Sequence, residues 1–305
     1  MLKRVVITNY LGESVEYKIE GVDVYENNGL LITEIEGLGP TGANITFNNL
    51  VSIDGSLYNS ARIESRNIVI HACFTWSKTI EESRLSSYRL FPLKKQVKIE
   101  VETENRKAYT YGYVEKNEPD IFKPQTDVMI SIMCESPFFL DSGGSSEDSF
   151  TCTEPLFEFV YENEGAEPVT EMGNKSDKTI NTVVYNGETE IGYTIKIHAL
   201  GRVTNPKIYF IDSGDMLTFD TARIEQITSK TFDDGDDIVL VMEDRNKACY
   251  FVSNGISTNI LNVVDRGFSW PKLTPGATNH YHVSADSGED YLRFFVEYQA
   301  VYEGV

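Results

Sequence analysis

The fold is decided by the C-terminal stretch that runs from GDMLTFD (214–220) through FSWPKLTPG (268–276) to YLRFFVEYQAVY (291–302). In the last segment, apolar and aromatic residues occupy every second position from 292 to 298, which is the period of a strand with one buried face. Turn-forming residues recur about every 8–12 residues between such strands. This spacing is typical of a β-sandwich or jelly roll, and nothing in the stretch has the pattern of a catalytic motif.

Most of the first half is also expected to form strands. Leu30–Glu36 and Val128–Cys134 are short apolar or alternating runs, and the second places apolar residues at every other position. One helix is expected, over Ile80–Leu90, because Thr79 and Glu82 have the spacing of a capping box. The chain is therefore predicted to be mainly β, with one helix in its first half.

A polar segment, DSGGSSEDS (141–149), interrupts these patterns and has the composition of a flexible linker. It follows the apolar PFFL (137–140), which we expect to close a first domain. The predicted boundaries are a first domain over residues 1–140, a linker over 141–153 and a second domain over 154–305. At 305 residues the chain is long enough for two such domains.

The chain is acidic, with a formal net charge of −20 at pH 7. Residues 1–140 hold 15 basic and 19 acidic residues, whereas residues 141–305 hold 12 and 28. This excess of carboxylates argues against binding nucleic acid through its phosphates and against docking on an anionic membrane. Self-association therefore needs apolar or locally complementary surfaces. The uneven distribution indicates either a division of labour between the halves or a chance difference in surface composition.

No targeting or membrane segment is predicted. MLKR (1–4) leads directly into VVIT (5–8), a strand pattern without the apolar core of a signal peptide, and no apolar run reaches the length of a membrane-spanning helix. The four cysteines have no CxxC spacing, so free thiols in a reducing compartment are expected; they are Cys73, Cys134, Cys152 and Cys249.

GLGPTG (37–42) matches the G-x-G-x-x-G pattern of dinucleotide-binding loops. Such a loop needs a helix directly after it, whose first N–H groups hold the pyrophosphate. Here the next residues are ANITFNN (43–49), a strand or loop pattern, and Pro40 lacks one of the N–H groups that a phosphate needs. A glycine-rich turn is therefore expected, and no cofactor-binding residue is assigned.

Two other segments contain residue types that bind metals. His280 and His282 share a strand face, but no third ligand is close to them in the sequence, so a structural or surface role is expected. Asp233–Asp237 contains four carboxylates around Gly235, without the spacing of an EF-hand loop. We expect a solvated hairpin tip there. Whether it binds a cation stays open, and no metal ligand is assigned.

No enzyme motif is present, since the chain has no Gly-x-Ser-x-Gly, no phosphate-binding Walker loop and no HExxH. Two carboxylates across a sugar could hydrolyse it, but among 47 acidic residues the sequence selects no pair. No catalytic residue is assigned, and the protein is not expected to be an enzyme. Aromatic side chains could instead stack on sugars, and the candidates, each with core packing as the alternative, are Tyr161, Tyr193, Tyr250 and Trp270.

The second half resembles the C-terminal domain of the distal tail proteins of siphophages. The matching pieces occur in the same order, and the ordered set is more specific than any one of them: NGE (186–188), YTIKI (193–197), Gly201, VTNPKI (203–208), Gly214-Asp215, Asp220-Thr221, WPKL (270–273), Pro275-Gly276 and the aromatic last strand. The first half is compatible with the ring domain of the same family through Val24-Tyr25, IEGLGP (35–40), the helix and PFF (137–139). The acidic stretch Glu154–Lys178 departs from the family pattern, as a loop peculiar to this protein would.

The resemblance implies a structural protein without a cofactor. Six copies would form a ring at the distal end of the tail tube, with the N-terminal domains as a belt and galectin-like β-sandwiches outside it. Basic residues of the first domain would offset repulsion between copies; examples are Arg84, Arg89, Lys94 and Lys95.

The same resemblance implies the partners and the location. The partners would be the tail tube protein, the tape-measure protein and the tail-associated hub or fibre protein. The location would be the tip of the virion tail, after assembly in the host bacterial cytoplasm. Two other classes stay open: a carbohydrate-binding module that contacts cell-wall glycans, and a wall-degrading enzyme.

Overall fold

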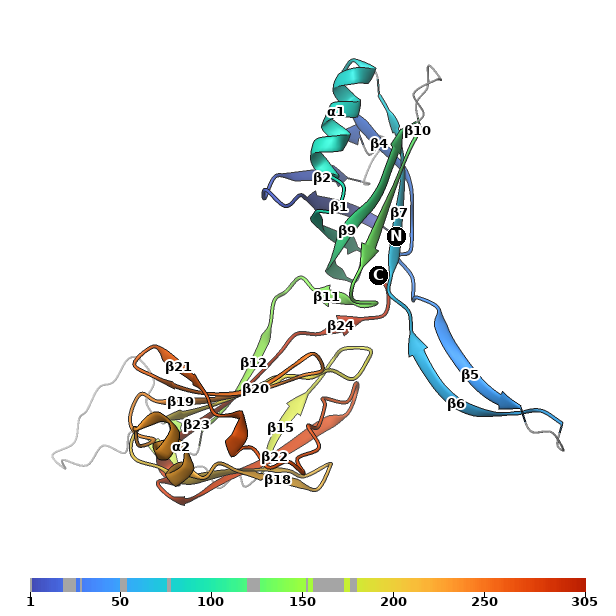
Figure 1. Cartoon of the computed structure of the whole chain (residues 1–305). Helices are drawn as coiled ribbons and strands as arrows, with labels where there is room; N and C mark the ends of the chain where they lie inside the picture. Colours follow the sequence, from blue (N-terminus) through green and yellow to red (C-terminus); the bar gives the residue numbers. More distant parts are fainter. Residues whose placement is uncertain are drawn as a thin grey trace, which may run out of the picture. The chain divides into compact units, whose positions relative to one another are not determined.

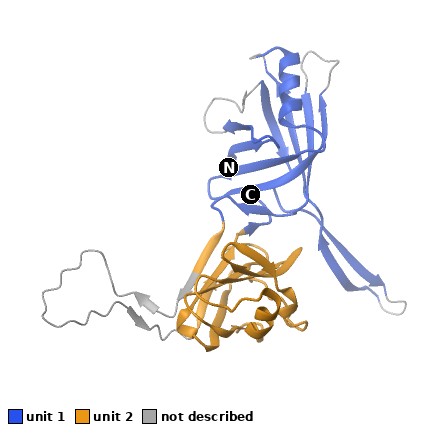
Figure 2. Cartoon of the chain, turned by 60° about the vertical axis from the view of Figure 1, so that its left-hand side comes forward, with its two compact units in different colours: residues 1–144, 301–305 blue, residues 145–300 orange. Residues whose placement is uncertain are grey.

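The computed structural model describes residues 2–18, 26–27, 29–49, 54–75, 78–119, 127–151, 153–155, 173–175 and 180–305. Within these residues the chain is mainly β, as predicted (Figure 1). It divides into two compact units, residues 1–144 with 301–305 and residues 145–300 (Figure 2). The second unit is therefore an insertion into the chain of the first.

One antiparallel sheet organises the first unit. Its order is β2-β1-β8-β9-β10-β7-β4-β3, and β11 pairs with both β9 and β24. The strands are β1 (Leu2–Thr8), β2 (Ser14–Lys18), β3 (Glu26–Asn27), β4 (Leu30–Glu36), β7 (Asn67–Phe74), β8 (Gln96–Thr103), β9 (Lys107–Pro119), β10 (Asp127–Cys134), β11 (Phe139–Asp141) and β24 (Val301–Tyr302). The predicted alternation in β10 is confirmed, because Val128, Ile130, Ile132 and Cys134 are all buried.

The predicted helix is confirmed as α1 (Ile80–Leu90). The hydroxyl of Thr79 accepts from the backbone N–H of Glu82 at 3.2 Å, and the Glu82 carboxylate accepts from the backbone N–H of Thr79 at 3.1 Å. These reciprocal bonds satisfy two N–H groups that a helix start otherwise leaves unpaired. The helix buries Ser83, Ser87 and Leu90, so its inner face is narrow and mostly small.

Gly29 shows how closely α1 approaches the sheet. A Cβ atom at this position would lie 2.4 Å from the Ser83 hydroxyl oxygen, and Gly29 has a φ of +82°. Both the space and the backbone conformation therefore require glycine here.

The second unit is a two-layer β-sandwich, as predicted. One sheet has the order β12-β23-β16-β19-β20-β21 and the other the order β15-β22-β17-β18. Their bounds are β12 (Ser146–Thr151), β23 (Leu292–Tyr298), β16 (Thr194–Ala199), β19 (Asp237–Glu243), β20 (Asn246–Ser253), β21 (Ile256–Asn259), β15 (Asn181–Val184), β22 (Thr278–Ser287), β17 (Thr204–Phe210) and β18 (Asp215–Thr218). The shorter elements are the pair β13 (Thr153–Pro155) and β14 (Gly173–Lys175), α2 (Thr221–Thr228), and the 3-10 turns η1 (Leu261–Val263) and η2 (Glu289–Tyr291).

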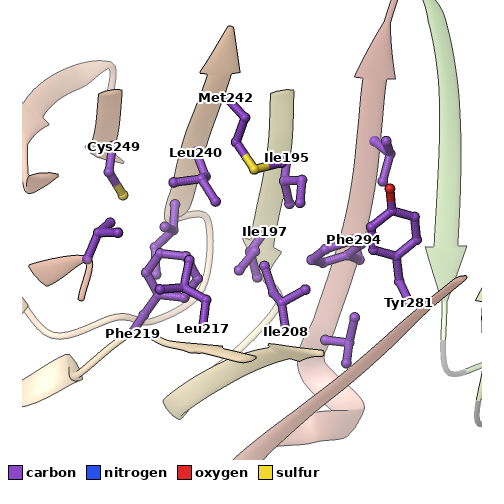
Figure 3. Packing of buried hydrophobic residues seen from close by; sticks show 14 of the residues in the cluster. Ile195, Ile197, Ile208, Leu217, Phe219, Leu240, Met242, Cys249, Tyr281 and Phe294 are labelled. Carbon is purple, nitrogen blue, oxygen red and sulfur yellow. The ribbon is translucent and has the colours of Figure 1, made fainter. Parts of the chain in front are cut away.

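Side chains from the two sheets meet in the core of the sandwich (Figure 3). Ile195 and Ile197 from β16 and Phe294 from β23 belong to one sheet, and Ile208 from β17 and Tyr281 from β22 belong to the other. Each is at most 3% exposed. Full burial of one such side chain contributes about 1.5–3 kcal/mol, so this core supplies the main stabilisation of the unit.

The unit boundaries differ from the expected 1–140, 141–153 and 154–305. Residues 145–151, expected in the linker, belong to the second unit, where β12 pairs with β23. Residues 301–305, expected in the second domain, belong to the first unit, where β24 pairs with β11. The polar composition of residues 145–151 does not reveal that they pair with a distant strand. The position of residues 301–305 at the end of the chain does not reveal it either.

Asn205 and Pro206 are residue types that favour turns, but they lie inside β17 and not between strands. Asn205 takes a φ of +46°, and the pairing with β22 skips it, since Thr204 pairs with Ser287 and Pro206 with Ala285. The register is the same on both sides of Asn205, so the strand continues through this left-handed residue without a bulge.

No helix among the described residues is long and apolar enough to cross a membrane.

Candidate functional site

The first unit carries a two-stranded arm, formed by β5 (Ala43–Asn49) and β6 (Ser56–Ile63). Among the described residues the two strands pair only with each other, and all fifteen of their residues are exposed. Figure 1 shows the arm extending from the sheet of the first unit. A lone hairpin is marginally stable in water, so an arm of this length gains order when another surface covers it.

One face of the arm is apolar. Directly opposed residues in an antiparallel pair share a face, and the register opposes Ile45 to Ala61 and Phe47 to Tyr58. Phe47 and Tyr58 are 53% and 63% exposed, and their rings meet edge to face at 6.4 Å. The pair Ala43 and Ile63 extends this face toward the base.

The other face of the arm is mainly polar. It contains the opposed pairs Asn44 with Arg62 and Thr46 with Ser60. The arm is therefore amphipathic, with its apolar side open in the single chain. An exposed apolar surface of this kind marks an interaction site.

Arg66, just after β6, fixes the base of the arm. Its side chain is fully buried, and its guanidinium donates to the backbone carbonyls of Gly37, Gly39, Pro137 and Glu303. Pro137 accepts two of these bonds, at 2.9 and 2.7 Å, so all five N–H donors of the guanidinium are used. The guanidinium carbon also lies 4.3 Å from the centre of the Phe139 ring.

Four neutral carbonyls thus hold one buried cation. Burial lowers the pKa of Arg66, but an arginine stays protonated at neutral pH. The sequence did not single out Arg66, because its partners lie up to 237 positions away. A local signal is the glycine-rich turn GLGP (37–40), whose Gly37 and Gly39 carbonyls accept from Arg66.

The glycine-rich turn over 37–42 is confirmed. It leads into β5 and not into a helix, so the context for a dinucleotide is absent. Gly37 has a φ of +82°, and a Cβ there would lie 2.1 Å from the carbonyl oxygen of Asn67. The turn presents carbonyls to Arg66, whereas a phosphate loop presents N–H groups.

The basic residues expected to offset repulsion between copies have different surroundings. Arg89 is already paired with Glu13, at 3.0 Å from its Nε, and this contact lowers the pKa of Glu13. Lys95 lies 5.3 Å from the centre of the Tyr10 ring, and Lys94 is exposed with a φ of +62°. Arg84 is half-buried on α1.

The two histidines of β22 point to separate partners. His280 Nδ1 lies 2.9 Å from the Asp212 carboxylate, while His282 packs on Tyr209 with ring centres 5.3 Å apart. Among the described residues, no group of three His, Cys, Asp or Glu side chains is placed to hold a metal ion.

Asp233–Asp237 is not a solvated hairpin tip, which corrects the prediction for this segment. It links α2 to β19, and Asp236 is only 8% exposed. The Asp236 carboxylate accepts from the backbone N–H of Asp233 at 3.1 Å, and Asp237 binds His198 at 2.6 Å. The Asp233 carboxylate also accepts from the backbone N–H of Asp234 at 2.9 Å, so three of the four carboxylates are engaged within the chain.

The aromatic residues considered for stacking on sugars differ in their exposure. Tyr193 is 2% exposed, so its ring belongs to the core and cannot stack on a ligand. Tyr250 and Trp270 are half-buried, and the Trp270 ring packs against Phe268 at 5.3 Å. Tyr161 lies outside the described residues.

Comparison with family models gives no match, and comparison with curated proteins gives no significant match. Among solved structures, the chain is similar to the Dit (gp 19.1) protein of phage SPP1, described as a paradigm of the hub adsorption apparatus in phages that infect Gram-positive bacteria. Identity is 12%, the match covers 97% of this chain and 98% of that one, and the TM-score is 0.64. The chain is also similar to a component of the phage P2 baseplate in its activated conformation with Ca, at 12% identity, 98% and 99% coverage and a TM-score of 0.47. The predicted resemblance to distal tail proteins is thus confirmed at the level of the fold.

Proposed function

We propose that this protein is a structural component of a phage tail tip, where six copies form a ring that joins the tail tube to the hub or receptor-binding apparatus. The observation that carries the proposal is the fold shared with SPP1 Dit over nearly the full length of both chains. The remaining support comes from the surface of the first unit.

The arm is suited to bind a second copy of the chain. Its apolar face needs a cover, and the segment from Ala43 to Ile63 contains one acidic and one basic residue, Asp54 and Arg62. In a chain of net charge −20, such an electrically neutral, apolar element meets little repulsion from an identical neighbour. The half of the sequence that carries it is also the less acidic one.

The rest of the proposed role follows from the tail-tip assignment. The partners are the tail tube, tape-measure and tail-associated hub or fibre proteins, and the location is the virion tail tip. The protein works as a non-enzymatic connector, without a catalytic, cofactor or metal site. The sandwich of the second unit is proposed to be galectin-like.

The test is the mass of the purified full chain, measured by light scattering on a size-exclusion column, with negative-stain imaging of the same peak. The expected mass is near six times 34.4 kDa, in rings with a central channel. Phe47→Asp places a charge on the apolar face of the arm, and should shift the mass toward 34.4 kDa.

The matched control is Asn48→Asp, which adds the same charge to the next residue, on the opposite face of the same strand. It should leave the rings intact. A wild-type chain that stays monomeric at all concentrations, also when mixed with its tail tube protein, contradicts the ring. Equal behaviour of the two variants contradicts the part assigned to the arm.

A second candidate function is binding of carbohydrate by the second unit. The observation that favours it is a small pocket in the second unit, which is lined by Tyr193, Asp212 and His280 among others. Binding of the full chain to a glycan array tests this candidate.

A further inference from the structure

The pocket in the second unit has a volume of about 290 Å³. Its walls come from the turn after β17, with Asp212, from the segment Ser269–Thr274, and from the start of β22, with His280 and Tyr281. This size is at the lower end of ligand pockets, so it suits a ligand of about one ring.

Asp212 and His280 form a fixed hydrogen-bonding pair at the pocket. The Asp212 carboxylate accepts from the backbone N–H of His280 at 2.6 Å and lies 2.9 Å from the ring Nδ1 of the same residue. Burial opposes ionisation of Asp212, but these two hydrogen bonds outweigh it and lower the pKa of the carboxyl group. The carboxylate is therefore an acceptor at neutral pH, with lone pairs beyond the two that His280 uses.

The floor of the pocket holds a pair of buried hydroxyls. The Tyr193 and Tyr281 oxygens lie 3.0 Å apart, and both rings are at most 3% exposed. Only one of the two O–H groups can donate within this pair, so the other must point elsewhere. The pair makes no other hydrogen bond to the described residues, and a buried tyrosine hydroxyl normally finds a partner.

The third wall is held in an unusual conformation. Trp270 has a φ of +58°, which is rare for a bulky side chain. Leu273 anchors the same segment through a two-way backbone bridge to Ile191, at 2.9 and 3.3 Å. Non-glycine residues in this region of backbone space cluster at binding sites, where surrounding contacts enforce the strain.

We propose that this pocket binds one ring of a polyhydroxylated ligand, a sugar residue, whose hydroxyls donate to Asp212 and accept from the tyrosine hydroxyl pair. The nonpolar lining residues Phe210 and Pro271 face the C–H side of the ring. Sugar hydroxyls both donate and accept, which matches a pocket that offers a fixed acceptor and a spare donor side by side.

Ions fit the pocket less well. An anion would face the Asp212 carboxylate, and the lysine that lines the pocket, Lys272, is already paired with Asp244 at 2.8 Å. A cation would find no set of three ligating side chains among the described residues. A neutral ligand therefore agrees best with the charges present.

The site is separate from the ring-forming arm and gives the second candidate function a location and a ligand class. The inference rests on that candidate, not on the ring. The two can fail independently, since one is measured by ligand binding and the other by mass.

The experiment is a titration of the full chain, followed by saturation-transfer NMR. The probes are the methyl glycosides of glucose, galactose, mannose, N-acetylglucosamine and N-acetylgalactosamine, with sodium phosphate and sodium acetate as ionic probes. At least one glycoside should bind with a dissociation constant on the order of 1 mM, and the ions should not. Tyr193→Phe and Asp212→Asn should each weaken that binding about tenfold, which corresponds to one lost hydrogen bond.

The matched control is Asp286→Asn, because Asp286 lies in β22 and also accepts hydrogen bonds, from Asn205 and Lys207, but is not part of the pocket. This variant should bind like the wild type, and thermal unfolding of each variant shows whether the fold is kept. A trisaccharide that contains the bound sugar is then tested. If it binds more tightly than the glycoside, the ligand of the pocket is part of a glycan chain, and if the affinities are equal, the ligand is a free sugar. The proposal is overturned if no glycoside binds, if only an ion binds, or if folded Tyr193→Phe and Asp212→Asn both bind as well as Asp286→Asn.

Discussion

The guanidinium of Arg66 donates a hydrogen bond to the backbone carbonyl of Glu303, 237 positions further along the chain. The same group binds Gly37 before the arm and Pro137 before the strand that leads to the second unit. Arg66 therefore ties together the base of the arm and the parts of the first unit on either side of the insertion.

Replacing Arg66 should destabilise the first unit strongly. Arg66→Met leaves four carbonyls without their donors, and each buried unsatisfied acceptor costs about 1–3 kcal/mol, so a loss of at least about 3 kcal/mol is expected. Arg66→Lys keeps the charge but not the planar five-donor group, and should recover only part of the loss. Urea denaturation measures both. Arg62→Lys, on the exposed arm, is the control and should stay within about 0.5 kcal/mol of wild type. A similarly small change for Arg66→Met contradicts this account.

Removing the cap of α1 should cost a smaller amount. Thr79→Ala loses the hydroxyl that accepts from the N–H of Glu82, with an expected destabilisation of about 1 kcal/mol in the same denaturation measurement. Ser86→Ala, within the same helix, changes a hydroxyl away from the cap and should be neutral or slightly stabilising. The capping box is not stabilising if the two variants unfold alike.

The reactivity of each cysteine thiol in the native chain should decrease as its burial increases. Burial raises the pKa of Cys249 to about 12 and also raises the pKa of the buried Cys134, so neither forms the reactive thiolate at pH 8. Iodoacetamide treatment of the native chain, read by peptide mass spectrometry, should leave both unmodified. The same treatment in urea should modify both. Modification of Cys249 in the native chain at the unfolded rate would show that the sandwich core opens readily.

Asp212 should contribute stability at neutral pH that disappears in acid. Hydrogen bonds from His280 hold its pKa in the folded chain below the ordinary value of 3.8. The contribution is therefore complete above that value and is lost as the pH falls through the lower, folded pKa. Asp212→Asn should lower the unfolding free energy at pH 6 by less than about 1 kcal/mol, because the side chain is half-exposed.

Below pH 3.8 the difference in unfolding free energy between Asp212→Asn and wild type should become smaller. Thermal unfolding followed by circular dichroism between pH 2.5 and pH 7 measures it. Asp54→Asn, at an exposed position next to the arm, serves as the control and should follow the wild type throughout. If the stability difference between Asp212→Asn and wild type stays constant from pH 2.5 to pH 7, Asp212 stabilises the fold through its shape and not through its charge.

The elements that could be predicted from the sequence depend on local chemistry. The alternation in β23 buries Leu292, Phe294 and Val296, as the period of two requires. The capping box of α1 lies within four residues and leaves a direct signature. The ordered set of short motifs identified a fold that overall identity of 12% to SPP1 Dit would not reveal.

What could not be predicted depends on contacts between distant parts. The bonds of Arg66 join loops that are far apart in the sequence, and the pocket joins Asp212 to His280, 68 positions apart. The arm was not expected either. Its strands alternate like sheet strands, and nothing in a period of two tells whether the apolar face is buried by the same chain or left open.

The pairing of β11 with β24 has a consequence for how such a chain can evolve. Leu140 lies opposite Val301, so the chain leaves and re-enters the first unit on adjacent antiparallel strands. The inserted residues, 145–300, therefore begin and end beside this strand pair. A short turn can join the two strands when the insertion is absent, and another domain whose termini lie close together can replace it. Recombination can thus exchange the sandwich for another domain while the sheet of the first unit stays the same.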